Sequence, residues 1–216
     1  MKTMVYVDAF NLYYGALKRT PHRWLDLQHL MANLFPQNQI VGIKYFTARV
    51  NPLPGNPDQP LRQQLYFRAL GTVPVVSIIE GHYLSHPKRM PLANPPPGGP
   101  FTVEVIYTEE KGSDVNLASH LLFDACQHSY DCAIVVSADS DLATPIEMAR
   151  QHMGKTVGVQ IPQLISGSRT RRRSAKLKQV ASFYREGIRA NVLASSQFPP
   201  PSPTPPAPSP NQYPGS

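Results

Sequence analysis

The sequence predicts an α/β fold: a three-layer α/β/α sandwich with a mainly parallel central sheet. Short apolar runs rich in β-branched residues, such as 133–136, have the composition of strands buried on both faces. Helical patterns follow these runs, and strands that alternate with helices form parallel sheets with right-handed crossovers. The 216 residues give room for one such domain and a tail.

The expected elements alternate along the chain. The first strand covers 4–11 and ends in polar residues, and Pro- and Gly-rich stretches at 51–60 and 85–100 are expected to be loops. The other expected elements are helices at 12–18 and 24–34, a strand at 40–48, a helix at 61–70, strands at 73–84 and 101–108 paired as an antiparallel hairpin, a helix from 113 or 114 to 125, a strand at 133–136, a helix at 142–152, a last core strand at 156–161 and a closing helix at 174–188.

Amino-acid composition indicates where the folded domain ends and a tail begins. Residues 1–190 are expected to form the domain, whereas 195–216 are rich in Pro and Ser and carry no charged residue. We expect this Pro-rich tail to be disordered with polyproline character, which suits the aromatic-lined grooves of a protein partner.

Charge and cysteine content indicate the partner and the compartment. The net charge of +7 favours nucleic acid as a partner. Two cysteines make neither a disulfide framework nor, unaided, a zinc site, so we expect the reducing cytoplasm. Asp8 interrupts the N-terminal apolar run, so no signal peptide is expected, and no stretch approaches the ~20 apolar residues of a membrane span.

Four aspartates are placed to meet at one edge of the sheet. Asp8 and Asp139 each follow an apolar strand, and ligands bind at the carboxyl edge of open parallel sheets. Asp114 opens a helix after a glycine, and Asp141 begins the helix that follows Asp139. Converging carboxylates repel each other, a divalent cation removes that cost, and oxygen ligands suit Mg²⁺ or Mn²⁺. Each aspartate could instead be only a helix cap.

Polar and cationic residues near these acids are candidate contacts to a phosphate backbone. Asn11 could position a nucleotide or metal-bound water, or only cap a helix. Lys111 could meet a phosphate, or only balance the two glutamates before it. An arginine-rich loop follows the last expected core strand, where phosphate binding is plausible, although such runs are usually solvated. Its candidate contacts are Arg171, Arg172 and Arg173.

Three motifs, in this order, resemble the NYN family of PIN-like nucleases. They are Tyr6-Val-Asp-Ala-Phe-Asn-Leu-Tyr-Tyr-Gly15, Glu110-Lys-Gly-Ser-Asp-Val-Asn-Leu-Ala118 and Val136-Ser-Ala-Asp-Ser-Asp-Leu142. The resemblance spans roughly 2–188 and implies a PIN-like, Rossmann-like sheet with a ribonuclease site that depends on Mg²⁺ or Mn²⁺.

The resemblance also implies roles for individual residues. Asp8, Asp114 and Asp139 would be the core acids that bind the metal. Asp141 would lie close by as a fourth catalytic acid, and Asn11 and Ser137 would support the site. Two positions depart from the family pattern: Ala138 stands where glycine is usual, and Ser113 stands where a small apolar residue is usual.

We therefore expect a metal-dependent ribonuclease, an endonuclease that hydrolyses RNA phosphodiester bonds. The alternative is a non-catalytic RNA-binding or scaffold protein whose acids hold a structural ion. A phosphatase-type hydrolase would need a second Asp two residues after the first, and Asp8 is followed by Ala9 and Phe10. The sequence leaves a homodimer open.

Overall fold

The computed structural model of the chain describes residues 1–52, 55–165 and 175–199. The strands of its central sheet are β1 (Lys2–Asp8), β2 (Gln39–Ala48), β3 (Val76–Pro91), β4 (Thr102–Lys111), β5 (Cys132–Val136), β6 (Thr156–Gln160) and β8 (Phe183–Arg185). They lie in the order β4-β3-β2-β1-β5-β6-β8, and every neighbouring pair is parallel except β3 with β4. The predicted mainly parallel sheet is therefore confirmed.

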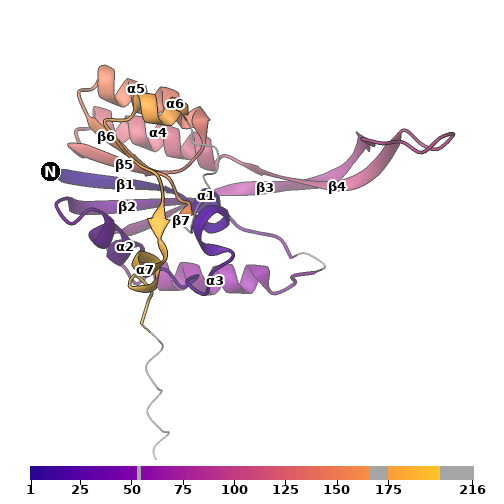
Figure 1. Cartoon of the computed structure of the whole chain (residues 1–216), viewed down its shortest axis with the longest axis horizontal. Helices are drawn as coiled ribbons and strands as arrows, with labels where there is room; N and C mark the ends of the chain where they lie inside the picture. The colour runs from indigo at the N-terminus through magenta and orange to yellow at the C-terminus, as the bar shows by residue number, and fades with distance from the viewer. Residues whose placement is uncertain (53–54, 166–174, 200–216) are drawn as a thin grey trace, which may run out of the picture.

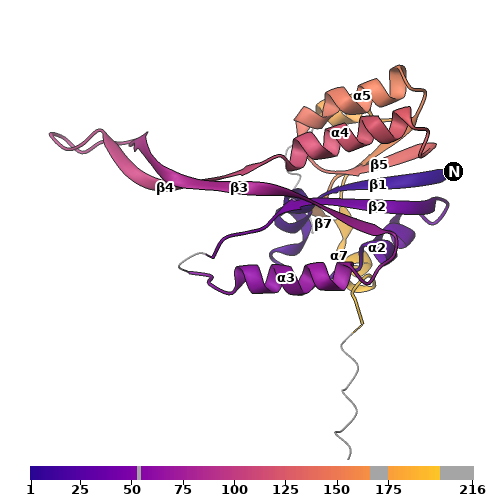
Figure 2. The same ribbon diagram turned by 180° about the vertical axis from the view of Figure 1, so that it is seen from behind.

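Helices cover both faces of this sheet (Figures 1 and 2). One face carries α4 (Ser113–Cys126), α5 (Ala143–Gln151) and α6 (Ala175–Val180). The other carries α1 (Ala9–Leu12), the π-helix η1 (Tyr13–Leu17), α2 (Leu27–Leu34), α3 (Gln59–Leu70) and α7 (Ala190–Ala194). A 3₁₀ turn, η2 (Ser140–Leu142), precedes α5, and a separate two-stranded sheet pairs β7 (Leu164–Ile165) with β9 (Ile188–Arg189). The three predicted layers are present.

The central strands contribute alternate side chains to two buried apolar clusters. Val5 and Val7 of β1 pack in one cluster with α1, α2 and α7, whereas Tyr6 packs in the other with α4 and α5. Every residue of β5 is buried, because helices cover both faces of the sheet there. None of its side chains reaches solvent, which is why the strand is apolar throughout. In the part of the chain that the structure describes, no helix has the length and apolar character to cross a membrane.

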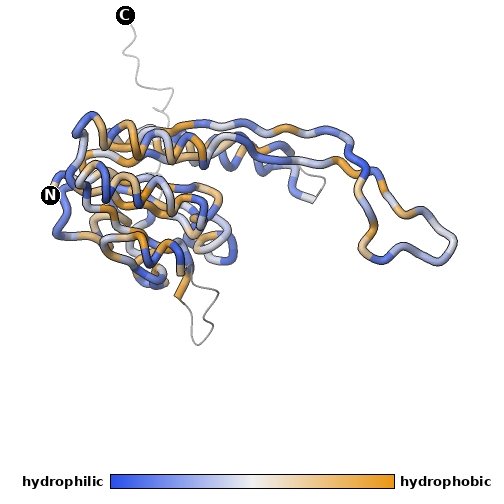
Figure 3. Tube along the Cα trace, turned by 90° about the horizontal axis from the view of Figure 1, so that it is seen from above, coloured by the Kyte–Doolittle hydropathy of each residue, from blue (hydrophilic) through white to orange (hydrophobic). Residues whose placement is uncertain are grey.

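β3 and β4 form a two-stranded ribbon that projects from the body (Figures 1 and 2). Their pairing runs without interruption from His82 with Lys111 to Pro91 with Thr102. The prediction of a loop at 85–100 was therefore wrong, because residues 85–91 continue β3. Prolines and basic residues fit there because this edge ribbon is exposed, and Figure 3 shows apolar and polar residues mixed along it.

The C-terminal part also differs from expectation. The helix expected at 174–188 ends at Val180, and the chain then adds β8 beside β6. The strand expected to be the last in the core is therefore followed by another.

Residues 195–199, which the sequence assigned to the tail, belong to the folded body. Ser196 is buried, its carbonyl accepts the backbone N–H of Asp26 at 2.8 Å, and Phe198 donates its backbone N–H to Trp24 at 2.8 Å. These contacts come from residues far apart in the sequence, so composition alone could not indicate them. The remainder of the expected tail, and the loop with Arg171, Arg172 and Arg173, lie outside the described residues.

Candidate active site

Two polar strand ends meet at the centre of the sheet. From β1 the chain builds outward through β2 and β3, and later through β5, β6 and β8 on the opposite side. The strand order therefore reverses between β1 and β5, and such a switch point is where α/β sheets place ligand sites, at the carboxyl ends of the strands. Asp8 is the last residue of β1, and Ser137 directly follows β5.

Asp8 is buried and held by uncharged donors. Its side chain accepts bonds from the Ser137 hydroxyl at 2.9 Å, the Asn11 backbone N–H at 3.0 Å and the Asn11 amide at 2.5 Å. The amide oxygen of Asn11 accepts the backbone N–H of Ala138 at 3.2 Å, so Asn11 ties the two strand ends together. Asp8 thus does both things considered for it: it caps α1 and lies at the edge of the switch point.

Asp139 lies beside Asp8 through the shared Ser137. Its backbone N–H donates to the Ser137 hydroxyl at 3.0 Å, and its carboxylate accepts the backbone N–H of Asp141 at 3.0 Å. Asp139 therefore caps η2, while the side chain of Asp141 is left exposed at the rim. Within the described residues, His128 is the one non-glycine residue with a positive φ, so Ala138 needs none of the freedom of the usual glycine.

A sharp turn brings Asp114 to the same edge. Gly112, with φ of 97°, precedes α4, and Asp114 stands in the first turn of that helix. The turn packs against β3 at Gly81, where a Cβ would lie 2.5 Å from the Lys111 carbonyl oxygen. Ser113 donates its backbone N–H and its hydroxyl to Glu110 at 3.0 and 2.8 Å, which fixes the start of α4.

The pKa values show that these acids share one electrostatic environment. Burial raises the pKa of Asp8, against the lowering effect of its bonds with Asn11 and Ser137. Partial burial, followed by the negative charges of Asp8, Asp139, Glu110 and Asp141, raises the pKa of Asp114 to about 6. The structure therefore brings all four predicted aspartates within electrostatic reach of each other.

The donor set fits a hydrated Mg²⁺ or Mn²⁺ ion. In the described ranges, no three Asp, Glu, His or Cys side chains come close enough to hold an ion directly between them. Mg²⁺ commonly keeps several waters and takes only one or two carboxylates from the protein. The carboxylates at this edge supply oxygen donors and negative charge, which is what such an ion requires.

Of the predicted cationic contacts to phosphate, the structure describes only Lys111. The ammonium group of Lys111 lies 2.7 Å from Glu109, in an exposed ion pair, which is the balancing role considered for it. The structure gives no position for the predicted arginines, because they fall in the undescribed range 166–174.

A second polar cluster inside the domain was missed. Asp124 accepts the Lys44 ammonium at 2.6 Å and the Tyr6 hydroxyl at 2.7 Å, and Lys44 lies 3.1 Å from His120. Burial and the neighbouring Lys44 lower the pKa of His120. Helical spacing gave a signal for it, since Asp124 falls on the same buried face of α4 as Leu117 and Leu121.

The sequence matches the model of the NYN domain over residues 2–184. The chain belongs to the NYN domain family. Membership suggests a nuclease-type function, and it agrees with the family resemblance of the three motifs.

Two further similarities complete the comparison of this NYN domain with known proteins. It is 30% identical over 223 residues to 6-hydroxy-3-succinoylpyridine 3-monooxygenase HspA of Pseudomonas putida (strain DSM 28022 / S16), covering 92% of this chain and 70% of that protein. It also resembles the crystal structure of VPA0982, a protein of unknown function from Vibrio parahaemolyticus RIMD 2210633, with a TM-score of 0.54. That likeness covers 87% of this chain and 92% of the other at 20% identity, and it supports the fold alone.

Proposed function

We propose that this NYN domain is a metal-dependent ribonuclease that hydrolyses RNA phosphodiester bonds. The observation that carries the proposal is the group of aspartates at the switch point, where Asp8 is 3% exposed and forms no ion pair with any described cation. Such a group is stabilised by a cation from solution. A net charge of +7 supports a polyanion as the substrate.

In this proposal the aspartates have two different roles, ion binding and proton transfer. Asp8, Asp114 and Asp139 surround a hydrated ion, one or two of them binding it directly and the rest through its waters, and Asn11 and Ser137 fix the orientation of Asp8. A bound Mg²⁺ or Mn²⁺ would supply a Lewis acid for the phosphodiester and a more acidic water. The carboxylate of Asp141, exposed at the rim, takes the proton of the attacking water.

The backbone of the RNA would be held by cations outside this edge. We assign that role to Arg171, Arg172 and Arg173, with Lys111 released from Glu109 as a further contact. Replacement of the three arginines by Ala should lower the salt dependence of RNA binding by roughly one unit of slope for each phosphate that is no longer neutralised. An unchanged slope would remove the arginines from the interface. Since the chain has only two cysteines, Cys126 and Cys132, and no disulfide framework, we place its action in the reducing cytoplasm.

The test of the ribonuclease proposal is incubation with mixed RNAs and DNAs in Mg²⁺, in Mn²⁺ and in chelator. We expect RNA to be cut with either ion and to stay intact in chelator, and Asp139→Asn to cut at least ~100-fold more slowly than the wild type. Binding of RNA without any cutting under all conditions would instead support the non-catalytic scaffold.

A second candidate is oxygenation of a small aromatic acid, and the similarity to HspA over nearly the whole chain favours it. The name of that relative describes a monooxygenase acting on 6-hydroxy-3-succinoylpyridine. We would supply this compound with O₂ and a two-electron donor, and follow O₂ uptake and product formation. Turnover of the compound, with no cutting of RNA, would favour oxygenation over hydrolysis.

A further inference from the structure

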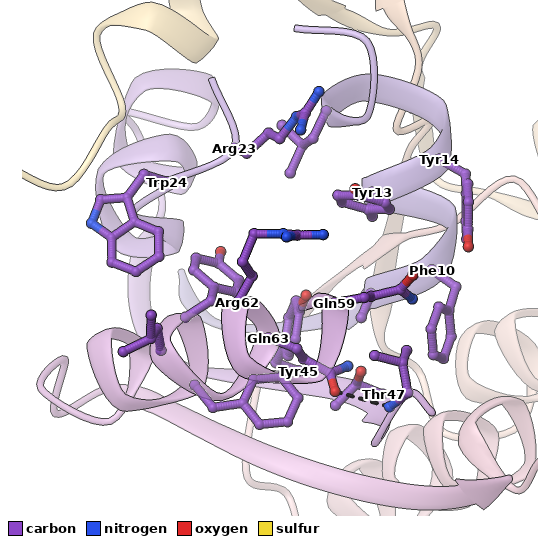
Figure 4. Close-up of a pocket in the computed structure, with 16 residues that line it drawn as sticks. Phe10, Tyr13, Tyr14, Arg23, Trp24, Tyr45, Thr47, Gln59, Arg62 and Gln63 are labelled. Carbon is purple, nitrogen blue, oxygen red and sulfur yellow. Dashed lines mark hydrogen bonds between the residues drawn. The ribbon is translucent and has the colours of Figure 1, made fainter. Parts of the chain in front are cut away.

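An aromatic pocket opens beside the acidic edge, on the face of the sheet that carries α1, η1 and α3 (Figure 4). Its volume is about 230 Å³. A dry cavity of about 150 Å³ is enough for benzene, so this pocket has room for a ring and a substituent. The aromatic side chains that line it are Phe10, Tyr13, Tyr14, Trp24, Tyr45, Tyr66 and Phe67.

The charge of the pocket is one-sided. Its lining contains two arginines and, among the described residues, no acid. Arg62 extends into the middle of the pocket and Arg23 lies at its border (Figure 4). Arg62 donates to the side-chain carbonyl of Asn56, and Arg23 donates to the Lys18 carbonyl at 2.7 Å. Neither guanidinium pairs with a carboxylate of the described chain, so both keep charge for a ligand.

These surfaces define a ligand chemistry. Aromatic side chains stack on flat rings, and a guanidinium binds an anion through paired N–H groups. We propose that the pocket binds a planar heteroaromatic ring that carries an anionic group, with the ring against the aromatic side chains and the anion on Arg62 and Arg23.

The pocket is connected to the acidic edge. Ala9 and Phe10, which directly follow Asp8, form part of its lining. Tyr45 also lines the pocket, and its pKa is raised by burial and then by the negative charge of Asp8. A ligand in the pocket therefore lies next to the proposed reaction site.

Two sources supply this chemistry. One is an unpaired nucleotide of RNA, whose base would be held beside the phosphate to be cut, and this source depends on the proposed ribonuclease function. The other is a free heteroaromatic acid, which needs no such function.

The chain provides its own reporter for the test. Trp24 is its single tryptophan, 40% exposed, and it lines the pocket. We would titrate the protein in chelator with a 5′-mononucleotide, a short single-stranded RNA and pyridine-3-carboxylate, following Trp24 fluorescence and confirming affinities by calorimetry. We expect saturable binding by at least one of them, and at least ~10-fold weaker binding of the uncharged analogue, a nucleoside or pyridine-3-carboxamide.

Arg62→Ala should weaken binding at least ~10-fold, since it removes the central cation. The matched control is Arg68→Ala, an exposed arginine of the same helix that is not part of the lining. Melting curves of both variants exclude loss of folding.

The outcomes separate the sources. Binding of the nucleotide and RNA but not of the pyridine acid assigns the pocket to a nucleotide, and the reverse assigns it to a free acid. Binding of all three supports the shared chemistry. Absence of binding by any probe, or equal loss in Arg62→Ala and Arg68→Ala, overturns the proposal. Because these measurements use chelator, failure of RNA cleavage does not affect them.

Discussion

Asp124 and Asp8 are both buried carboxylates on the same folded body, yet their charges are balanced in different ways. Asp124 faces the Lys44 ammonium at 2.6 Å and the Tyr6 hydroxyl at 2.7 Å. Asp8 receives only uncharged donors, and further aspartates lie near it. The two groups lie at opposite ends of α4, which carries Asp114 at its start and Asp124 near its end.

The difference separates a structural carboxylate from a candidate ligand. A buried charge that already has its counter-ion gains nothing from a metal, whereas an uncompensated group of acids costs stability until a cation binds. Substitution should therefore have opposite effects on the metal-free protein at the two places.

The largest expected effect is at the balanced carboxylate. Asp124→Asn keeps the shape but leaves the mostly buried Lys44 without a counter-ion. We expect the free energy of unfolding to fall by about 3 kcal/mol. For a domain of this size that lowers Tm by about 6–12 °C, measured by calorimetry. Asp131→Asn, at an exposed aspartate, is the control. An unchanged Tm for Asp124→Asn would show that the ion pair contributes nothing.

The second-largest expected effect is on RNA cleavage, through the aspartates around Asp8 that lack a counter-ion. Asp139→Asn still accepts the Asp141 N–H, so Tm without metal should stay the same or rise as repulsion is relieved. Cleavage of RNA in Mn²⁺ should fall about 100-fold, equivalent to about 2.7 kcal/mol of transition-state stabilisation. Asp131, at the start of β5 on the opposite edge of the sheet, again serves as the control. If Asp139→Asn melts lower and cleaves normally, Asp139 is only a cap.

A smaller effect should come from moving one end of α4. In Gly81→Ala the added Cβ would meet the Lys111 carbonyl, so the turn before Asp114 must shift. We expect a loss of about 1–2 kcal/mol in stability, typical of overpacking, together with reduced metal affinity. Gly55→Ala is the matched control, because its Cβ would meet no atom within 4 Å. Full metal affinity in Gly81→Ala would show that the position of Asp114 is unimportant for the ion.

The smallest effect is on the pH dependence of stability. The pKa of Asp114 is raised from 3.8 to about 6 in the folded protein, so between these two values the folded state binds more protons than the unfolded state. Lowering the pH from 7 to 5 without metal should therefore raise the contribution of Asp114 to stability. Because the side chain is exposed, screening limits this to about 1 kcal/mol or less, or roughly 2 °C in Tm. The difference in Tm between wild type and Asp114→Asn, measured at both pH values, isolates this contribution.

The sequence was sufficient for the mainly parallel sheet, apart from β8 and the extension of β3, and for the acids of the candidate site. Asp8 and Asp139 follow strands whose apolar character is local, so their place at the carboxyl edge could be predicted from the alternation of elements. Asp114 was expected at this edge because it opens a helix after a glycine, whereas the tight approach of its turn to Gly81 is a tertiary contact that the sequence does not mark.

Other features could not be predicted for physical reasons. The extension of β3 to Pro91 is set by pairing with β4, which overrides the loop character of its prolines. The aromatic pocket joins Tyr13 of η1 and Trp24, which precedes α2, to Tyr66 of α3, and no spacing along the chain marks it. The partnership of Lys44 with Asp124 likewise joins residues 80 positions apart.

The Ser137–Asp8 hydrogen bond has a consequence for the order in which the protein is made. It joins residues 129 positions apart. In the sheet β1 lies between β2 and β5, and β5 is made much later than β2. During synthesis from the N-terminus, a growing chain holds Asp8 and Asn11 long before Ser137 and Asp139 have been added. The proposed RNA-cutting centre therefore cannot assemble on a half-made chain. Under the proposed ribonuclease function, the messenger RNA being translated beside that chain would be spared until most of the domain has left the ribosome.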